Sequence, residues 1–344
     1  MNNDIIAECI AISMSNFLNV PYKNQAVIDR YLPGGIESKA SNICHYCSVD
    51  TLKSIMSNGC LRFSDIRFLN DSTEFNEAVL FVRNILYEKN YLPEFQKLIL
   101  DSAEMKELKD YKQSGITKSE NGTYESKIFR TYTCSFSTDD DILNMWNYYA
   151  TYGNGVNIVF DHSWNLFEGS NKAEINVSDK LENGIIMDRG LVIYKNEDKE
   201  KCLIEMLDKL QDIYTKVKNN SEEYQKYILF AFKQSIENMR CFFKNVSFEN
   251  EKEYRIVLKI PEDLLLEKKF EGDIVNYNQF IRGNILIPYV DYKFNKKSVK
   301  RVTINPYVTG EKGIFRLGIE ELLWSEGIKD VDIIYSAIPM RKYN

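Results

Sequence analysis

The sequence predicts an α+β fold, in which helices and strands follow one another irregularly around one hydrophobic core. Segments that alternate apolar and polar residues, such as "RTYTCSFS" at 130–137, predict strands. Segments with apolar residues every three or four positions, such as 71–90, predict amphipathic helices. No repeat of about 20 to 50 residues is present, which excludes a solenoid.

The first third of the chain reads as helix, strand, helix, strand and helix. We expect a helix over 4–18 and a short strand over "SNICHYCS" at 41–48. The segment "VDTLKSIMSNG" then places Leu52, Ile55 and Met56 at helical spacing, and Gly59 marks its end. An extended segment follows at 60–69. The helix over 71–90 carries a buried face made of Phe75, Val79, Val82 and Leu86.

The rest of the chain returns to strands around a pair of long helices. Residues 93–127 are polar, and we expect a variable excursion there. Residues 197–245 hold two apolar helical patterns separated by "KNNSEE", which predicts a helical hairpin. A short helix over 140–153 is expected to end at Gly153. The other expected elements are strands at 155–161, 184–194, 251–261, 286–290, 299–306 and 331–338, and a helix at 317–327.

These elements predict a single domain over 1–344. Residues 1–40 form an N-terminal helical extension, and 197–245 form the inserted hairpin. The α+β core consists of the two remaining segments, 41–196 and 246–344.

The composition argues against two classes of partner. The net charge of −6 lacks the basic excess that bulk binding to nucleic acid phosphates requires. No apolar run approaches the roughly 20 residues that span a bilayer, and the N-terminus has no positive region of the kind that precedes a secretory signal. The seven scattered cysteines are typical of reduced core thiols. We expect a cytoplasmic protein that does not contact a membrane.

The segment "CHYC" at 44–47 places His45 between two cysteines. A zinc site needs four ligands, and no second pair of ligands follows in the sequence. A redox Cys-x-x-Cys pair usually opens a helix, whereas the helix here begins only at 49. We therefore expect no metal, and a strand in which His45 and Cys47 share one face while Cys44 and Tyr46 share the other.

Four ordered blocks resemble an uncharacterised bacterial family, catalogued as a domain of unknown function (DUF-2971). The family label implies no activity, although a bacterial effector in defence against phages would fit it. The blocks are "ICHYCSVDTLKSIMSNGCLRFSDIRFLNDSTEF", "SFSTDDDILNMWNYYATYGNGVNIVFD", "FENEKEYRIV" and "IIYSAIPMR".

The opening unit is also similar to the first strand, helix and second strand of ADP-ribosyltransferases. The residues that carry this resemblance are His45, the helix 49–58, Gly59 and Leu61. The resemblance implies a split sheet that binds NAD as a substrate, in which the histidine bonds a ribose hydroxyl. It also implies a residue near the second strand that frames the nicotinamide, either Phe63 or Ser64.

A glutamate on a later strand completes the site in that superfamily. Glu251 and Glu253 are two positions apart on the strand 251–261, so they share a face with Arg255. Cleavage of the nicotinamide–ribose bond builds positive charge on the ribose, which a carboxylate stabilises. The resemblance assigns this role to Glu253, and Glu251 would position or deprotonate the acceptor.

The resemblance thus predicts transfer of ADP-ribose to a macromolecule, protein or nucleic acid, or hydrolysis of NAD, without a metal. The alternative is a non-catalytic binding module that meets a protein partner through 197–245. In that case His45 is a core residue and the glutamates lie at a solvated strand end. The remaining expected NAD-binding residues are Tyr46, Ser64, Ser135, Ser137, Trp146, Tyr149 and Arg255.

Overall fold

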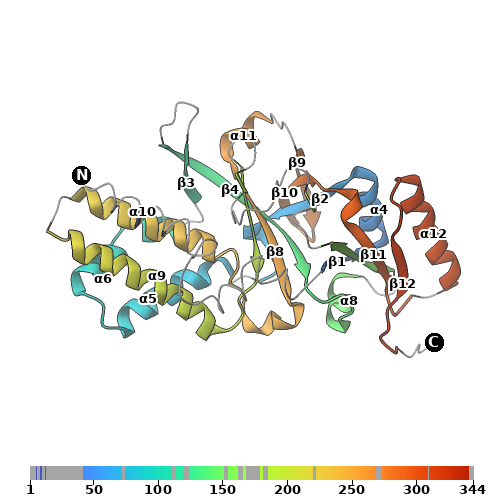
Figure 1. Cartoon of the computed structure of the whole chain (residues 1–344), viewed down its shortest axis with the longest axis horizontal. Helices are drawn as coiled ribbons and strands as arrows, with labels where there is room; N and C mark the ends of the chain where they lie inside the picture. The colour runs from blue at the N-terminus through green and yellow to red at the C-terminus, as the bar shows by residue number, and fades with distance from the viewer. Residues whose placement is uncertain are drawn as a thin grey trace.

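In the computed structural model, a helical lobe lies beside a long twisted sheet, and further helices cover parts of that sheet (Figure 1). The predicted mixed α+β architecture is confirmed. The structure describes residues 5, 8, 9, 12, 42–71, 74–109, 113–118, 124–150, 154–161, 166–167, 179–180, 185–219, 222–268, 273–308 and 310–340. Of the predicted helix 4–18, residues 5, 8, 9 and 12 are described and are helical. The rest of that helix and of the expected extension 1–40 lies outside the described residues.

The described strands form one 12-stranded sheet with the order β12-β11-β5-β1-β4-β2-β10-β9, and β3, β6, β7 and β8 join it off this path. The β11–β12 pair is parallel, and the other pairs are antiparallel. The strands are β1 Asn42–Ser48, β2 Cys60–Asp65, β3 Gln113–Lys118, β4 Tyr124–Ser137, β5 Gly155–Asp161, β6 Asp179–Lys180, β7 Ile186–Leu191, β8 Glu253–Pro261, β9 Ile274–Arg282, β10 Ile285–Lys293, β11 Val299–Ile304 and β12 Asp332–Tyr335.

Strand β4 is shared by four neighbours. One of its edges pairs with β8 along residues 129–137. The other edge takes β3, then β2 at Thr133, then β1 at Ser137. Residues 134–136 of β4 pair with neither β1 nor β2, so the sheet splits between these two strands.

The turn from β1 to β2 forms as the sequence predicts. In α4 (Val49–Asn58), the Ser48 side chain accepts a hydrogen bond from the backbone N–H of Thr51 at 3.1 Å and caps the first turn. Gly59 ends the helix with φ +61°, a left-handed conformation that glycine adopts without strain. The predicted apolar face of Leu52, Ile55 and Met56 is buried.

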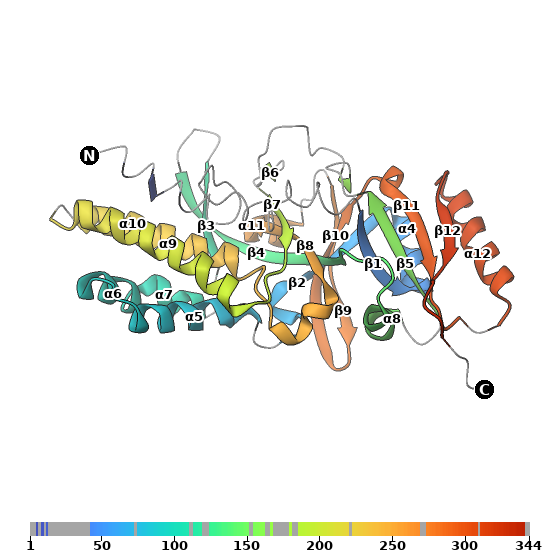
Figure 2. The same cartoon turned by 60° about the horizontal axis from the view of Figure 1, so that its bottom comes forward.

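The helical lobe has two layers, one of α9 and α10 and one of α5, α6 and α7 (Figure 2). Helices α9 and α10 form the predicted helical hairpin. Helix α5 is the helix predicted over 71–90. The expected excursion at 93–127 instead holds α6, α7 and β3, because Phe95, Ile99, Met105 and Leu108 pack into the lobe core. The helices are α5 Glu74–Glu88, α6 Pro93–Leu100, α7 Ala103–Lys109, α9 Asn196–Val217 and α10 Glu222–Met239.

Shorter helices cover the rest of the sheet. Helix α8 ends at Tyr149, earlier than the predicted Gly153, which lies outside the described residues. The predicted helix at 317–327 begins earlier, at Lys312. These elements are α8 Leu143–Tyr149, α11 Glu262–Glu267, α12 Lys312–Ser325 and the 3-10 turns η1 Ile66–Phe68, η4 Val246–Glu251 and η5 Lys296–Ser298.

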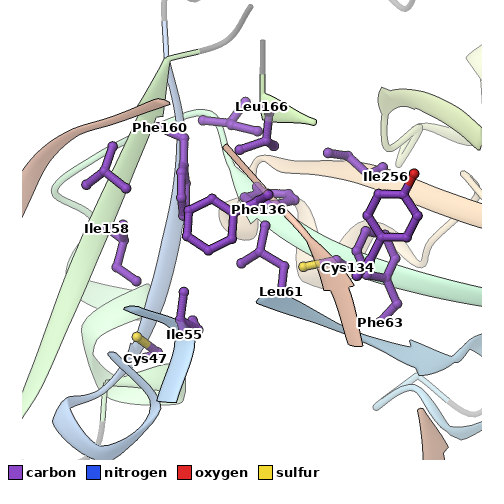
Figure 3. Close-up of a cluster of buried hydrophobic side chains, with 14 of the residues drawn as sticks. Cys47, Ile55, Leu61, Phe63, Cys134, Phe136, Ile158, Phe160, Leu166 and Ile256 are labelled. Carbon is purple, nitrogen blue, oxygen red and sulfur yellow. The ribbon is translucent and has the colours of Figure 1, made fainter. Parts of the chain in front are cut away.

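The two faces of the sheet around β1 and β4 are buried differently. One face carries a large apolar cluster that includes Cys47, Phe63 and Phe136 (Figure 3). On the opposite face a smaller cluster under α8 contains Tyr46 and Trp146. This division decides which of the expected site residues can meet.

Candidate functional site

The Glu-x-Glu segment lies at the junction of η4 and β8. Lys252, with φ +45°, ends η4, and β8 begins at the next residue. The side chains of Glu253 and Arg255 project to one face of the sheet, as predicted, because they alternate along β8. Glu251 was predicted to lie on the same strand, but it is the last residue of η4, and the left-handed Lys252 separates it from β8. All three residues are buried, with exposed fractions of 6%, 3% and 0%.

Two cations neutralise the two carboxylates. Lys244 Nζ donates to Glu251 Oε2 at 2.7 Å and to Glu253 Oε2 at 2.8 Å. Arg255 donates to both oxygens of Glu253, from Nε at 2.7 Å and from Nη2 at 3.1 Å. Its Nη1 donates to the carbonyl of Cys241 at 2.7 Å. Buried charges are tolerated when they are paired and hydrogen-bonded in this way.

These contacts hold Glu253 in its charged form. Burial raises the pKa of the Glu253 carboxyl, but the charges of Arg255 and Lys244 outweigh burial and lower that pKa to about 2. The hydroxyl of Tyr194 accepts a hydrogen bond from the backbone N–H of Glu253 at 2.9 Å. Glu253 is therefore a fixed carboxylate, and both of its oxygens accept hydrogen bonds within the fold.

Tyr149 extends the cluster toward the surface. Its hydroxyl donates to Glu251 Oε1 at 3.0 Å, so each Glu251 oxygen also accepts a hydrogen bond. Burial, reinforced by the Glu251 charge, raises the pKa of Tyr149. A tyrosine that stays protonated can donate a hydrogen bond but cannot serve as a base near neutral pH.

Trp146, Tyr46 and Ser137 fix the segment between β4 and α8. Trp146 is fully buried, packs edge-on against the Tyr46 ring at 4.8 Å, and donates from Nε1 to Asp141 Oδ1 at 2.7 Å. The Tyr46 hydroxyl donates to the carbonyl of Asp139 at 3.0 Å. Ser137 Oγ donates to the carbonyl of Glu251 at 2.9 Å. These polar atoms are used within the fold.

His45 lies in the split of the sheet. Its Nδ1 is 3.1 Å from the carbonyl oxygen of Ser135, so Nδ1–H donates to that oxygen. Its ring packs against Phe136 at 5.7 Å. Burial lowers the pKa of His45, which keeps the imidazole neutral near neutral pH. In this tautomer Nε2 is the nitrogen that carries a lone pair.

The register places His45 away from the glutamates. Cys44 lies opposite Ser137, and Ser137 lies opposite Glu253, so these three side chains share one face. His45, the next residue after Cys44, projects to the other face with Phe136. The expectation that His45 and Glu253 border one cleft is wrong for this reason.

The candidates near the second strand are also divided. Phe63 is fully buried in the apolar cluster (Figure 3). Ser64 lies opposite Thr133, and both it and the partly buried Ser135 are on the Glu253 face. Because His45 and Glu253 project from opposite faces, neither Phe63 nor Ser64 is on the same face as both of them.

Cys44 and Cys47 do not lie close enough on one face of the sheet to bind the same metal ion. Cys44 and Cys47 belong to clusters on opposite faces of the sheet, and burial raises the pKa of each thiol to about 12. In the part of the chain that the structure describes, no group of three or more His, Cys, Asp or Glu side chains could hold a metal ion. None of its helices is long and apolar enough to cross a bilayer.

Sequence reasoning missed Lys244 and Tyr194, which complete the cluster. Lys244 follows α10 in the segment "CFFKN", where it is the only charge in an apolar run. A lysine in an apolar segment shortly before two glutamates could have indicated a buried ion pair. Tyr194 follows β7, and only the pairing of β7 with β8 brings it to Glu253.

No curated protein and no solved structure matches the chain. The model of one family, described as "Protein of unknown function (DUF2971)", matches residues 145–256, which run from α8 through the helical hairpin into β8. This match confirms the predicted family resemblance, whereas the similarity to ADP-ribosyltransferases stays a prediction. Over residues 145–256, about a third of its length, the chain is therefore similar to the family described as "Protein of unknown function (DUF2971)".

Proposed function

We propose that the chain is a protein-binding module whose docking surface is the β9–β10 hairpin. One observation carries this proposal: the apolar residues Ile281, Ile285 and Leu286 at the hairpin tip are 72%, 57% and 63% exposed. Isolated exposed apolar residues are common, but a contiguous group at the end of one element is typical of an interaction surface.

The fold holds this hairpin in a defined position. Ile281 lies opposite Leu286 and Arg282 lies opposite Ile285, with Gly283 in the turn at φ +60°. Arg282 Nη1 donates to Asn70 Oδ1 at 3.0 Å, which connects the tip to the segment after β2. A partner would therefore meet a preformed surface, which reduces the entropy lost on binding.

The charged cluster supports a binding role over a catalytic one. Lys244 and the Cys241 carbonyl follow α10, whereas Glu253 and Arg255 belong to β8, so the cluster joins the helical lobe to the sheet. A carboxylate that stabilises a ribosyl cation must approach the sugar. Glu253 has 3% of its surface exposed and both oxygens occupied.

The helical hairpin at 197–245 exposes less apolar surface to a partner than the sequence suggested. Its apolar side chains, among them Leu203, Leu207 and Phe232, are buried in the core of the lobe. This packing supports the β9–β10 hairpin, rather than 197–245, as the partner surface.

A second candidate function is NAD binding with transfer of ADP-ribose, and the state of His45 favours it. The imidazole is held by the Ser135 carbonyl and kept neutral by burial, so Nε2 can accept a hydrogen bond from a ribose hydroxyl. This candidate needs a carboxylate other than Glu253. The suggested role in bacterial defence stays a prediction under either function.

Site-specific photo-crosslinking in cells tests the binding proposal. A photoreactive amino acid at Leu286 should crosslink to a protein, whereas the same group at Glu200, on the exposed polar face of α9, should not. Crosslinking from neither position, or equally from both, contradicts the proposal. Incubation with NAD tests the second candidate: nicotinamide release by the wild type that is lost in His45→Ala would favour the transferase.

A further inference from the structure

We infer that the partner of this hairpin is a protein segment that carries carboxylates beside aliphatic side chains, and that it docks on the sheet face that bears Arg62 and Arg282. This inference rests on the proposed function and specifies the chemistry of its partner. It follows from the charges of that face, the free donors of the two arginines and the exposed apolar residue beside them.

One face of the hairpin continues onto β2. Arg282 of β9 lies opposite Ile285 of β10, and Asp291 of β10 lies opposite Arg62 of β2. Directly paired residues project to the same side of a sheet, and every second residue along a strand returns to that side. These four side chains therefore share one face of the sheet, which we call the arginine face.

Two aromatic rings hold the arginines on this face. The guanidinium group of Arg62 lies 3.8 Å from the centroid of the Tyr289 ring and 5.7 Å from that of Phe280. The guanidinium group of Arg282 lies 5.5 Å from the centroid of the same Phe280 ring. Because such cation–π contacts orient a guanidinium group, both cations are held near Phe280 before a partner arrives.

Each arginine keeps donors for a partner. Arg62 Nε donates to Asp291 Oδ1 at 3.2 Å, and Arg282 Nη1 donates to the neutral side chain of Asn70 at 3.0 Å. Within the described part of the chain, these two side chains make no other hydrogen bond. Both are exposed, that of Arg62 by 44%. Since a guanidinium group can bind a carboxylate through two parallel hydrogen bonds, each arginine can take a carboxylate of the partner.

The arginine face is positive, although the net charge of the chain is −6. Among the described residues of β2, β9 and β10 that project to it, Arg62, Arg282 and Lys293 are cations. Asp291 is the one acid there, and Arg62 already pairs with it. The carboxylates of a partner would therefore meet uncompensated cations, which is the complementarity that directs association between proteins.

Two other modes of binding fit this surface less well. A nucleic acid would meet the arginines through its phosphates and would leave Ile285, which is 57% exposed beside Arg282, without an apolar contact. Addition of a strand to β9 is opposed by the register shift between Asp291 and Tyr292 and by the charge of Arg282, both of which protect a strand edge. An acidic segment with aliphatic side chains that lies on the face satisfies both the charges and Ile285.

Photo-crosslinking from Ile285 in cells, followed by mass spectrometry of the crosslinked peptide, tests this inference. We expect a protein peptide that contains Asp or Glu. Arg282→Glu should lower the crosslinking yield by about tenfold or more, because it places like charges together. Lys300→Glu, which reverses an exposed cation on β11 and changes the net charge equally, is the matched control and should leave the yield unchanged. Thermal unfolding checks that both variants are folded.

A charge exchange makes the test specific. A synthetic peptide with the crosslinked sequence should bind the wild type, and Arg282→Glu should raise its dissociation constant by about tenfold or more. Replacement of its acidic residues by lysine should weaken binding to the wild type and restore binding to Arg282→Glu. A structural role of Arg282 alone would not produce this reversal.

Three results would overturn the inference: a crosslink to nucleic acid, a crosslinked peptide without acidic residues, or equal yields from the wild type and Arg282→Glu. If Leu286 still crosslinks to a protein in any of these cases, the proposed function stands without the inference. No crosslink from either Ile285 or Leu286 contradicts both.

Discussion

His45 and Glu253 project from opposite faces of the sheet, and β4 runs between the two strands that carry them. The spacing of residues along β1 is compatible with either face. Register decides the outcome, because a slip of one residue between β1 and β4 would turn His45 toward the glutamates. The pairing of Cys44 with Ser137 therefore separates an imidazole and a carboxylate that the sequence motifs suggested would meet.

Lys244 is expected to be essential for stability, because it is the cation shared by two buried carboxylates. Lys244→Met should lower the free energy of unfolding by about 3–5 kcal/mol, since it leaves buried charge uncompensated. Lys252→Met is the matched control: it removes a half-exposed ion pair with Asp139, which is worth about 0–1 kcal/mol. Urea denaturation measures both, and equal effects would show that the cluster does not join the lobe to the sheet.

The stability of the protein should decrease in acid partly through Glu253. Its pKa is about 2 in the folded state and 4.5 as the unperturbed value, so the unfolded chain binds the proton first as the pH falls. The contribution of Glu253 is thus complete above pH 4.5 and is lost as the pH falls toward 2. Between neutral pH and about pH 3, the unfolding free energy of Glu253→Gln should fall less than that of the wild type. Identical pH profiles would argue against the ion pairs.

Tyr149 and Tyr148 provide a comparison within one helix. Tyr149→Phe removes the hydroxyl that donates to Glu251 and leaves a buried carboxylate oxygen without that hydrogen bond, which should cost about 1–3 kcal/mol. Tyr148 is 69% exposed, so Tyr148→Phe should change the unfolding free energy by less than about 0.5 kcal/mol. Thermal and urea unfolding should rank the two variants in this order, and the reverse order would exclude the assigned role of Tyr149.

His45 should titrate below its ordinary pKa of 6.5 because the ring is buried. Since the unfolded chain is protonated first, the contribution of neutral His45 to stability is present above pH 6.5 and declines as the pH falls below it. The chain has two histidines, so NMR of the imidazole in a His162→Gln background reports on His45 alone. A pKa at or above 6.5 would contradict the buried, neutral state and weaken the second candidate function.

Local patterns predicted local structure well. The apolar spacing in α4 and the glycine at its end are properties of neighbouring residues, and both predictions are confirmed. The common face of Glu253 and Arg255 was predicted from strand alternation alone, and the two side chains form an ion pair. Strand β9 was missed, although the Gly-Asn turn at 283–284, between two segments rich in Ile, Val, Tyr and Phe, is a hairpin signal.

Contacts between distant segments could not be predicted in the same way. One of the two cations that pair with Glu253 is Lys244, which lies in the segment after α10. Nothing in the spacing of either segment specifies that approach. The face that His45 occupies relative to Glu253 likewise depends on the pairing of three strands, β1, β4 and β8. Motif spacing therefore identified residues of the cluster but did not give their arrangement.

The sheet around β4 joins strands from distant parts of the chain, which affects folding during synthesis. His45 contacts the Ser135 carbonyl 90 positions later, and Arg62 on β2 pairs with Asp291 on β10, 229 positions later. During synthesis, β1 and β2 emerge long before the strands that cover their edges. Pairing between such distant segments is slow, and uncovered strand edges promote aggregation. A chain whose synthesis ends before β10 is complete would therefore have a β2 edge that lacks its β10 partner.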